Sequence, residues 1–342
     1  MQNSHRELKK LWAKGSQFLG CPLSIMCGAM SWVSEANLVS AMSNAGGFGV
    51  IACGAMNSEQ LTSEIQKTKN LTTKPFGVNL IVMHPDLLNL INVCIAEKVS
   101  HVVLAGGLAA VEHIRNLKDV GIKTMCFAPN LAIAKRSIKS NIDALIIEGS
   151  EAGGHIGAVS TSVLAQEILP HIKEVPVFVA GGIGSGEMML RYLQMGASGC
   201  QLGTKFVCAT ESIAHPKFKE TFIKANSRNA IASVQLDKEF PVIPVRALEN
   251  KATKNFLALQ RTIIDQFNAG KINKKEAQLT IEKYWAGALR NAVINGDVEN
   301  GSLMAGQCVG MVKKEQSVVE IINDLIVEAM SALNQHHSFS TY

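Results

Sequence analysis

The stretch DALIIEGSEAGGHIG, residues 143–157, guides the interpretation of the whole chain. An apolar run typical of a buried strand, residues 143–147, leads into a loop with four glycines and one histidine, His155. Glycines let a backbone approach a ligand closely, and α/β enzymes place their sites at the carboxyl ends of their strands. His155 is therefore a candidate acid or base. The alternative is a tight turn whose histidine bonds only to the backbone.

Seven further β-rich runs accompany this one, and longer helical patterns separate them. The eight expected strands are residues 23–27, 48–52, 76–81, 101–105, 123–127, 144–147, 175–180 and 199–202; the helical patterns include 34–44, 58–68, 87–97, 111–119 and 132–140. Eight alternating units predict an α/β fold, a closed (β/α)8 or TIM barrel. The alternative is a doubly wound open sheet, which would carry G-x-G-x-x-G after its first strand. That fingerprint is missing after Cys27.

The pattern changes after the eighth unit. Residues 228–255 are mixed, with Pro241 and Pro244 bracketing two apolar residues, and indicate an inserted segment. Helical patterns follow at 253–268, 274–291 and 316–333. We expect a TIM-barrel domain at 1–227, a small, mainly helical domain or lid at 228–310, and a C-terminal helix returning to the barrel, with a polar tail, at 311–342.

Composition indicates a soluble globular protein, with 47% hydrophobic and 18% charged residues among 342. The net charge of +5 is small and the Lys and Arg residues are scattered, so we expect no nucleic-acid partner. No apolar run reaches the ~18 residues that span a bilayer, and the N-terminus lacks the apolar core of a signal peptide. We expect a cytoplasmic protein without a membrane partner. The apolar C-terminal helices weakly indicate a homodimer.

The eight cysteines include no C-x-x-C pair, and several lie within strand-like runs. We therefore expect buried free thiols. No Cys and His cluster has the spacing of a zinc site, so no metal is expected. His336 and His337 fall in the expected polar tail and are interpreted as disordered surface residues.

Two glycine-rich turns indicate a phosphate site. AGGIGSG, residues 180–186, follows the seventh strand and leads into a helix beginning near Glu187, and Gly203 and Thr204 follow the eighth strand. In barrels these two loops, with a helix N-terminus, commonly bind phosphate because glycine amides and the helix dipole face the anion. The alternative is that the glycines only allow tight packing of strand on helix.

Other strand ends suit a flat ligand. Met30 follows the first strand and can lie against a planar ring, and Asn79 offers an amide at the third. Asn79 and Glu148 suit the polar edge of an isoalloxazine ring. An FMN lying across the barrel mouth and facing His155 would therefore satisfy all these loops. Alternatively, Met30 is a core residue and Asn79 a turn cap. A loop at 300–310, NGSLMAGQCVG, either connects two helices or walls an apolar ligand.

Six segments resemble the nitronate monooxygenase (2-nitropropane dioxygenase) family, a close relative of the flavin-type enoyl-acyl-carrier-protein reductase. The segments are GAMSWVS (28–34), KPFGVNL (74–80), EGSEAGGHIG (148–157), AGGIGSGE (180–187), QLGTKFVCATES (201–212) and GSLMAGQCVG (301–310). The resemblance covers nearly the whole chain, and EAGGH followed by AGGI and QxGT is specific. It implies a barrel with a small helical domain that binds FMN noncovalently.

Carried over by position, the resemblance places His155 at the family's catalytic histidine. It implies FMN contacts at Ala29, Met30, Asn79, Glu148, Gly153, Gly181, Gly182, Gln201, Leu202, Gly203 and Thr204, and a substrate or lid segment containing Ser302, Met304 and Gln307.

The resemblance implies two activities on a small-molecule substrate. In the monooxygenase, His155 would take the α-proton of a nitroalkane or orient a nitronate, and FMN would react with dioxygen. In an enoyl or quinone reductase, NADH or NADPH would reduce FMN, and for an enoyl thioester His155 would position or protonate the substrate. The first loop reads Gly-Ala-Met where the reductase branch has a double glycine before the methionine, which leaves the branch open; we favour the monooxygenase.

Two readings outside these branches make distinct predictions. A purine-nucleotide dehydrogenase would need a cysteine in the loop after the sixth strand, and residues 149–160 contain none. A non-catalytic flavin or phosphate carrier would show no change in any reaction rate on His155→Ala.

Overall fold

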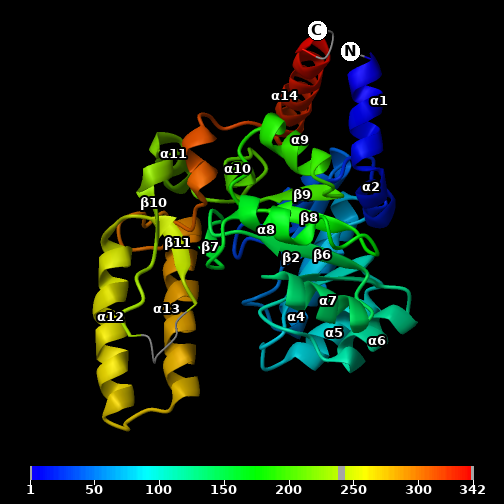
Figure 1. The fold of residues 1–342 in the computed structure, drawn as a ribbon. Coiled ribbons are helices and arrows are strands. Elements are labelled where there is room, and N and C mark those ends of the chain that lie inside the picture. Colours follow the sequence, from blue (N-terminus) through cyan, green and yellow to red (C-terminus); the bar gives the residue numbers. More distant parts are fainter. Residues whose placement is uncertain (1, 238–242, 340–342) are drawn as a thin grey trace.

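The computed structural model describes residues 2–237 and 243–339, and its centre is a closed barrel of eight parallel strands (Figure 1). Each predicted strand matches a barrel strand, so the TIM barrel is confirmed and the open sheet is wrong. In barrel order the strands are β1 (Ile25–Cys27), β2 (Phe48–Ala52), β3 (Gly77–Ile81), β4 (His101–Ala105), β5 (Lys123–Phe127), β6 (Ala144–Glu148), β8 (Val177–Ala180) and β9 (Gly199–Leu202).

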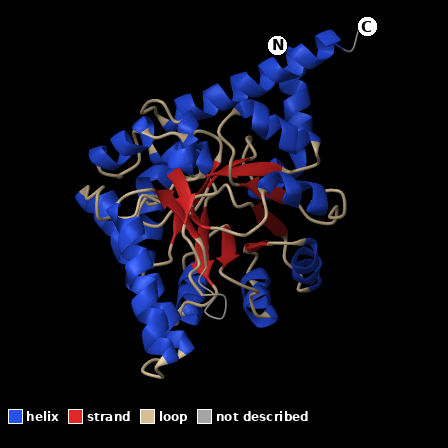
Figure 2. Ribbon diagram, turned by 60° about the vertical axis from the view of Figure 1, so that its left-hand side comes forward, coloured by secondary structure: helices blue, strands red, loops and turns tan. Residues whose placement is uncertain are grey.

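A helix follows each barrel strand, and the helices after β1 to β6 and after β8 cover the outer face of the barrel (Figure 2). Side-chain caps fix where several of these helices begin: Asn57 and Gln60 form a capping box on α4, and Asn130 caps α7. The helices are α3 (Ala36–Asn44), α4 (Ser58–Leu71), α5 (Leu87–Ala96), α6 (Val111–Asp119), α7 (Leu131–Lys139), α8 (Thr161–Ile168), α9 (Gly186–Gln194) and α10 (Thr204–Val207).

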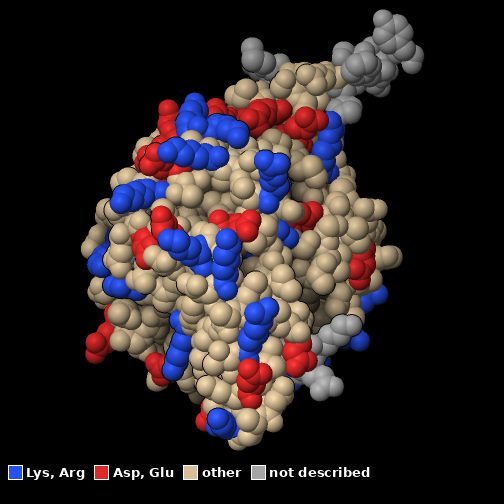
Figure 3. Space-filling view, turned by 90° about the vertical axis from the view of Figure 1, so that its left-hand side faces the viewer, with Lys and Arg blue, Asp and Glu red and all other residues tan. Residues whose placement is uncertain are grey.

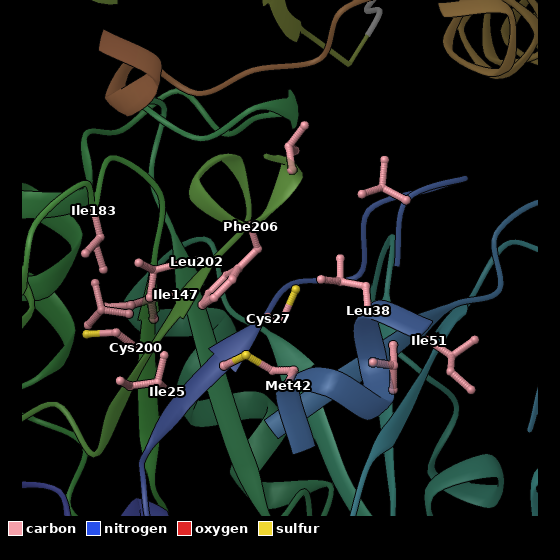
Figure 4. Packing of buried hydrophobic residues seen from close by; sticks show 14 of the residues in the cluster. Ile25, Cys27, Leu38, Met42, Ile51, Ile147, Ile183, Cys200, Leu202 and Phe206 are labelled. Carbon is pink, nitrogen blue, oxygen red and sulfur yellow. The ribbon is translucent and has the colours of Figure 1, made fainter. Parts of the chain in front are cut away.

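Side chains along each barrel strand alternate between two apolar layers. The outer layer lies between strands and helices, and Figure 4 shows part of it, including Ile25, Cys27, Ile147, Cys200 and Leu202. The inner layer fills the barrel with Met26, Phe48, Val50, Ile146 and Phe178. This alternation determines which side chains at the strand ends face the barrel axis.

The two chain ends add helices that the sequence patterns did not predict in full. Near the N-terminus, α1 (Gln2–Leu11) and α2 (Ala13–Leu19) bring Phe18 and Leu19 against the inner layer. The last helix, α14 (Val318–Phe339), packs on α9 and lies beside α1 (Figure 1). The helix expected from the pattern at 316–333 continues to Phe339; the side chains of His336 and His337 lie outside the described ones.

The segment after the barrel forms a cap that is part sheet and part helical hairpin. After α11 (Pro216–Lys224) and η1 (Ser227–Asn229) come β10 (Ala230–Ala232) and β11 (Val245–Leu248), followed by α12 (Lys251–Asn268) and α13 (Lys274–Asn295), which project from the barrel (Figure 1). Pro241, one of the two prolines that mark the expected inserted segment, lies outside the described residues. The cap has its own core, which includes Phe256 and Trp285.

All eight cysteines are free and buried, as predicted. None of the helices in residues 2–237 and 243–339 combines the length and apolarity needed to cross a bilayer.

His101 lies at the amino end of β4 and is buried between the rings of Phe18 and Phe48. Its Nε2 lies 3.0 Å from the carbonyl oxygen of Phe18, and its Nδ1 lies 2.9 Å from the hydroxyl of Ser100. Burial lowers the pKa of His101 to about 4 from its ordinary value of 6.5, because an imidazolium there would lose its hydration. The histidine therefore contributes a neutral side chain to the base of the barrel.

We predict that His101 makes the protein less stable in mild acid. The unfolded chain binds a proton near pH 6.5 and the folded chain near pH 4, so stability is full above the first value and falls through this window. The expected loss of unfolding free energy is about 2 kcal/mol between pH 7 and pH 5. Urea unfolding at both pH values should show a smaller difference for His101→Gln; equal differences for the two proteins would contradict the prediction.

Candidate active site

The carboxyl ends of the barrel strands form one ring of inward-facing positions, which we call the mouth. Strand register aligns Ala180 with Glu148 on one side and Gln201 on the other. Ala180 belongs to the inner layer, so the side chains level with it also turn toward the axis. By the same alternation Asn79 faces inward from β3, two residues beyond Gly77. The barrel therefore brings Asn79, Glu148 and Gln201 to the mouth.

Asn79 and Gln201 are almost buried yet lack polar partners. They are 8% and 7% exposed, and neither side-chain amide forms a hydrogen bond with the residues that the structure describes. Gly28 leaves room beside Gln201, since a Cβ there would lie 3.4 Å from its amide nitrogen. These groups fit a flat ligand with donors and acceptors on its edge.

Backbone amides gather where β8 and β9 end. The N–H groups of Gly182, Gly203 and Thr204 donate no hydrogen bond within the described ranges. The N-terminus of α9, by contrast, is already occupied: the Gly186 N–H donates to Glu328 Oε2 at 2.6 Å, and the Ser185 hydroxyl accepts from Met188. The amides that remain available for an anion lie in the two glycine turns and at the start of α10. The expected phosphate site therefore consists of these amides without the N-terminus of α9.

The loop after β1 connects the mouth to the cap. A Cβ on Gly203 would lie 3.4 Å from Met30 Sδ, so this methionine stands beside the β9 turn. Trp32 adopts a left-handed backbone with φ 67°, which is unfavourable for a residue other than glycine. The Arg290 guanidinium of α13 lies 5.5 Å from the centre of its ring. Met30 is placed to contact a ligand, and Trp32 contacts the cap.

His155 lies on a short strand, β7 (Gly154–His155), which pairs antiparallel with β11 of the cap. The sheet order is β10-β11-β7, and His155 is aligned with Val245. The small domain is mainly helical, as expected, because α12 and α13 make up most of its regular structure, but the expectation of a loop at His155 is wrong. A two-residue strand has no readable periodicity, and its partner lies far along the chain. The histidine side chain remains exposed.

The segment near residue 305 supports the other side of this loop. A Cβ on Gly153 would lie 2.6 Å from the backbone of Ala305, so only glycine allows this approach. The N–H of Gln307, at the start of η2 (Gln307–Met311), donates to the Glu151 carbonyl at 2.9 Å. A Cβ on Gly154 would lie 3.6 Å from Met304 Sδ. Met304 and Gln307 thus lie next to the His155 strand.

Two expected site residues are placed differently. Leu202 belongs to the outer layer, and its carbonyl accepts from Gly28 N at 2.9 Å, so its side chain does not reach the mouth. Ser302 is 1% exposed, and its backbone N–H donates to Ala288 of α13. Its hydroxyl has no hydrogen-bond partner among the described residues.

Glu148 and His155 interact electrostatically at the mouth. Burial raises the pKa of Glu148 to about 7, and the nearby His155 partly opposes this rise. Near neutral pH the Glu148 carboxyl is therefore divided between its protonated and ionised forms. Perturbed acids beside a histidine are typical of catalytic sites. The Glu148 carboxyl can therefore take up or release a proton at the mouth near neutral pH.

Sequence patterns gave no indication of Arg246, which the structure places against this loop. It lies on β11, is 8% exposed, and donates from Nε to the Ser150 carbonyl at 2.9 Å. A single arginine in a mixed segment carries no motif, so only the folded arrangement identifies it.

Comparisons with known proteins agree with the fold. Residues 16–94 and 88–328 match the family model described as nitronate monooxygenase. A Rhodococcus jostii protein named (3aS,4S,5R,7aS)-5-hydroxy-7a-methyl-1-oxo-octahydro-1H-indene-4-carboxyl-CoA dehydrogenase is 28% identical over 93% of this chain and 96% of its own. A probable nitronate monooxygenase of Staphylococcus aureus is 25% identical over 87% and 92%. The structure of FabK from Thermotoga maritima superposes with a TM-score of 0.83 at 33% identity, covering 95% of this chain and 98% of that one.

Proposed function

Because this chain belongs to the nitronate monooxygenase family, we propose that it is an FMN-dependent oxidoreductase that oxidises alkyl nitronates or nitroalkanes with dioxygen. One observation carries the proposal: unpaired amide groups surround the mouth, and His155 stands beside them with Glu148. An oxidoreductase of this kind needs a cofactor site and a proton acceptor in one place.

The donors at the mouth are of the kinds that FMN needs. The amides of Gly182, Gly203 and Thr204 would hold the phosphate, because glycine turns expose N–H groups to an anion. Asn79 and Gln201 would bond the polar edge of the ring, and Met30 would lie against its face. When bound, FMN would supply the electron transfer.

His155 would act on the substrate's proton. It would take the α-proton of a nitroalkane or orient a nitronate, and Glu148 would assist because its ionised form favours a proton on the imidazole. Ionisation of Glu148 increases as the pH rises through about 7, where its pKa lies. The cap strand β11 holds His155 by its backbone, and the side chain is exposed.

Anaerobic mixing tests the proposed reaction. The purified protein with FMN should keep its flavin absorbance when NADH or NADPH is added, and should consume oxygen when a nitronate is then supplied in air. Rapid bleaching by either nicotinamide, without oxygen uptake on the nitronate, would assign the protein to the reductase branch. Free FMN at the same concentration is the control for uncatalysed reaction.

The charge distribution favours one second candidate, nicotinamide-dependent redox chemistry on an acyl thioester. The hairpin at 251–295 holds eight of the 33 Lys and Arg residues but three of the 28 Asp and Glu, so it carries +5 and the remainder, with 25 of each, is neutral. Figure 3 shows this side of the molecule, where basic groups are interspersed with acidic ones. The net positive charge of the hairpin therefore attracts anions over a wide area and without a single basic patch. A coenzyme A thioester is such an anion, and the name of the Rhodococcus relative contains one.

A further inference from the structure

Arg246 is an almost fully buried cation with no carboxylate partner. Its side chain is 8% exposed, and no Asp or Glu of the described residues lies within ion-pair distance. Its guanidinium donates instead to two carbonyl oxygens, from Nε to Ser150 at 2.9 Å and from Nη1 to Ala230 at 2.6 Å. Burial lowers the pKa of Arg246, with partial compensation from Glu151. The cation thus joins two backbone segments and forms no ion pair at contact distance within the described residues.

Burial of the Arg246 charge reduces the stability of the fold, which indicates that the residue has a role other than stabilisation. A buried charge loses its hydration, and a well-packed apolar side chain can replace such a group without loss of stability. The planar guanidinium offers donors in a fixed fork, which suits the fixing of two carbonyls at a defined separation. Arg246 is therefore suited to holding geometry and is a poor means of adding stability.

The Ser150 carbonyl lies in the loop that connects Glu148 with His155. Ser150 comes two residues after Glu148 and five before His155. The backbone of β11 aligns Arg246 with Gly154 and its neighbour Val245 with His155, so the same strand holds the loop at a second point. Farther along, the Ile156 N–H donates to the Pro244 carbonyl at 2.9 Å. The cap therefore fixes the loop before and at the histidine.

We propose that Arg246 is a positioning residue, which fixes from the cap the loop that carries Glu148 and His155. The expected effect of Arg246 on turnover rests on the proposed function, whereas the expected effect of Arg246 on the position of the loop does not. Misplacement of a catalytic group by about 1 Å can lower a rate ~10²-fold, so a positional role has a measurable effect without any contact to substrate.

Arg246→Met tests the proposal, with Lys219→Met as the matched control. Lys219 of α11 is a second buried cation, 6% exposed, which bonds the Ala209 carbonyl and Glu315 at 2.7 Å each and has no bond to residues 148–157. Hydrogen–deuterium exchange of the peptide covering residues 148–157 is the first readout. We expect exchange ~10-fold faster or more in Arg246→Met and no change in Lys219→Met. Unchanged exchange in Arg246→Met, or equal acceleration in both variants, would overturn the proposal.

Steady-state kinetics give the second readout. For Arg246→Met, kcat should fall ~10-fold or more while KM changes little, and Arg246→Lys should recover part of the loss because an ammonium can still donate to one carbonyl. A change in KM without a fall in kcat would overturn the positioning role. If Arg246→Met does not fold, Arg246→Lys alone decides by the same two readouts. If the unmodified protein has no oxidoreductase activity, the proposed function fails, and the exchange measurement still decides whether Arg246 holds the loop.

Discussion

His155→Ala is expected to keep FMN bound and to lower turnover ~10²-fold or more, the usual contribution of a general acid or base. The side chain is exposed and its strand is held through backbone pairing with β11, so its loss removes chemistry and leaves the loop in place. Stopped-flow rates with saturating substrate, together with the flavin absorbance of the purified variant, measure both halves of this expectation.

A matched control separates a catalytic loss from a general one. His171 is another exposed histidine, beyond the end of α8, and His171→Ala should leave both turnover and flavin content unchanged. A His155→Ala protein that unfolds or loses its flavin would make the histidine structural. A variant with unchanged rates would support the non-catalytic carrier.

Gly182→Ala is expected to weaken FMN binding by about 10- to 100-fold, as expected when one charge-assisted hydrogen bond is lost. Gly182 has φ 74°, and a Cβ at this position would lie 3.0 Å from the Cβ of Glu151. The added methyl group must shift either its own turn or the His155 loop, and the Gly182 N–H shifts with it. Titration of the apoprotein with FMN, followed by flavin fluorescence, measures the change.

Gly121→Ala is the control for this substitution. Gly121 has φ 82° with nothing within 4 Å of an added Cβ, so the variant carries a similar backbone strain of about 1–2 kcal/mol without touching the mouth. Both variants should lose similar stability, and FMN affinity should fall in Gly182→Ala alone. Equal affinities in the two variants would remove Gly182 from the phosphate site.

The barrel was predictable because each of its strands is a short apolar run between longer helical patterns. The strands at 48–52, 101–105 and 123–127 agree with the structure at both ends. Pairing over long distances was not predictable. The strand at His155 exists only because β11 lies beside it, and α2 is a seven-residue helix whose apolar residues bury against the barrel.

The candidate site shows the same division. Residue type and position at a strand end predicted Asn79, Glu148 and His155 as site residues, since barrel enzymes carry their functional groups at the carboxyl ends of the strands. The direction of each side chain depends on its place in the strand, which is why Gln201 faces the mouth and Leu202 faces the helices. Arg246 comes to the site through a sheet that forms only in the folded chain.

The central claim is that one nucleotide lies across the mouth with its phosphate on the amides of Gly182, Gly203 and Thr204. Parallel titrations of the apoprotein with FMN and with riboflavin, which lacks the phosphate, test it most directly. We predict saturation at one FMN per chain and at least ~10-fold weaker binding of riboflavin, since charge-assisted hydrogen bonds to the phosphate are lost. Absence of FMN binding, or equal affinity for the two flavins, would contradict the claim.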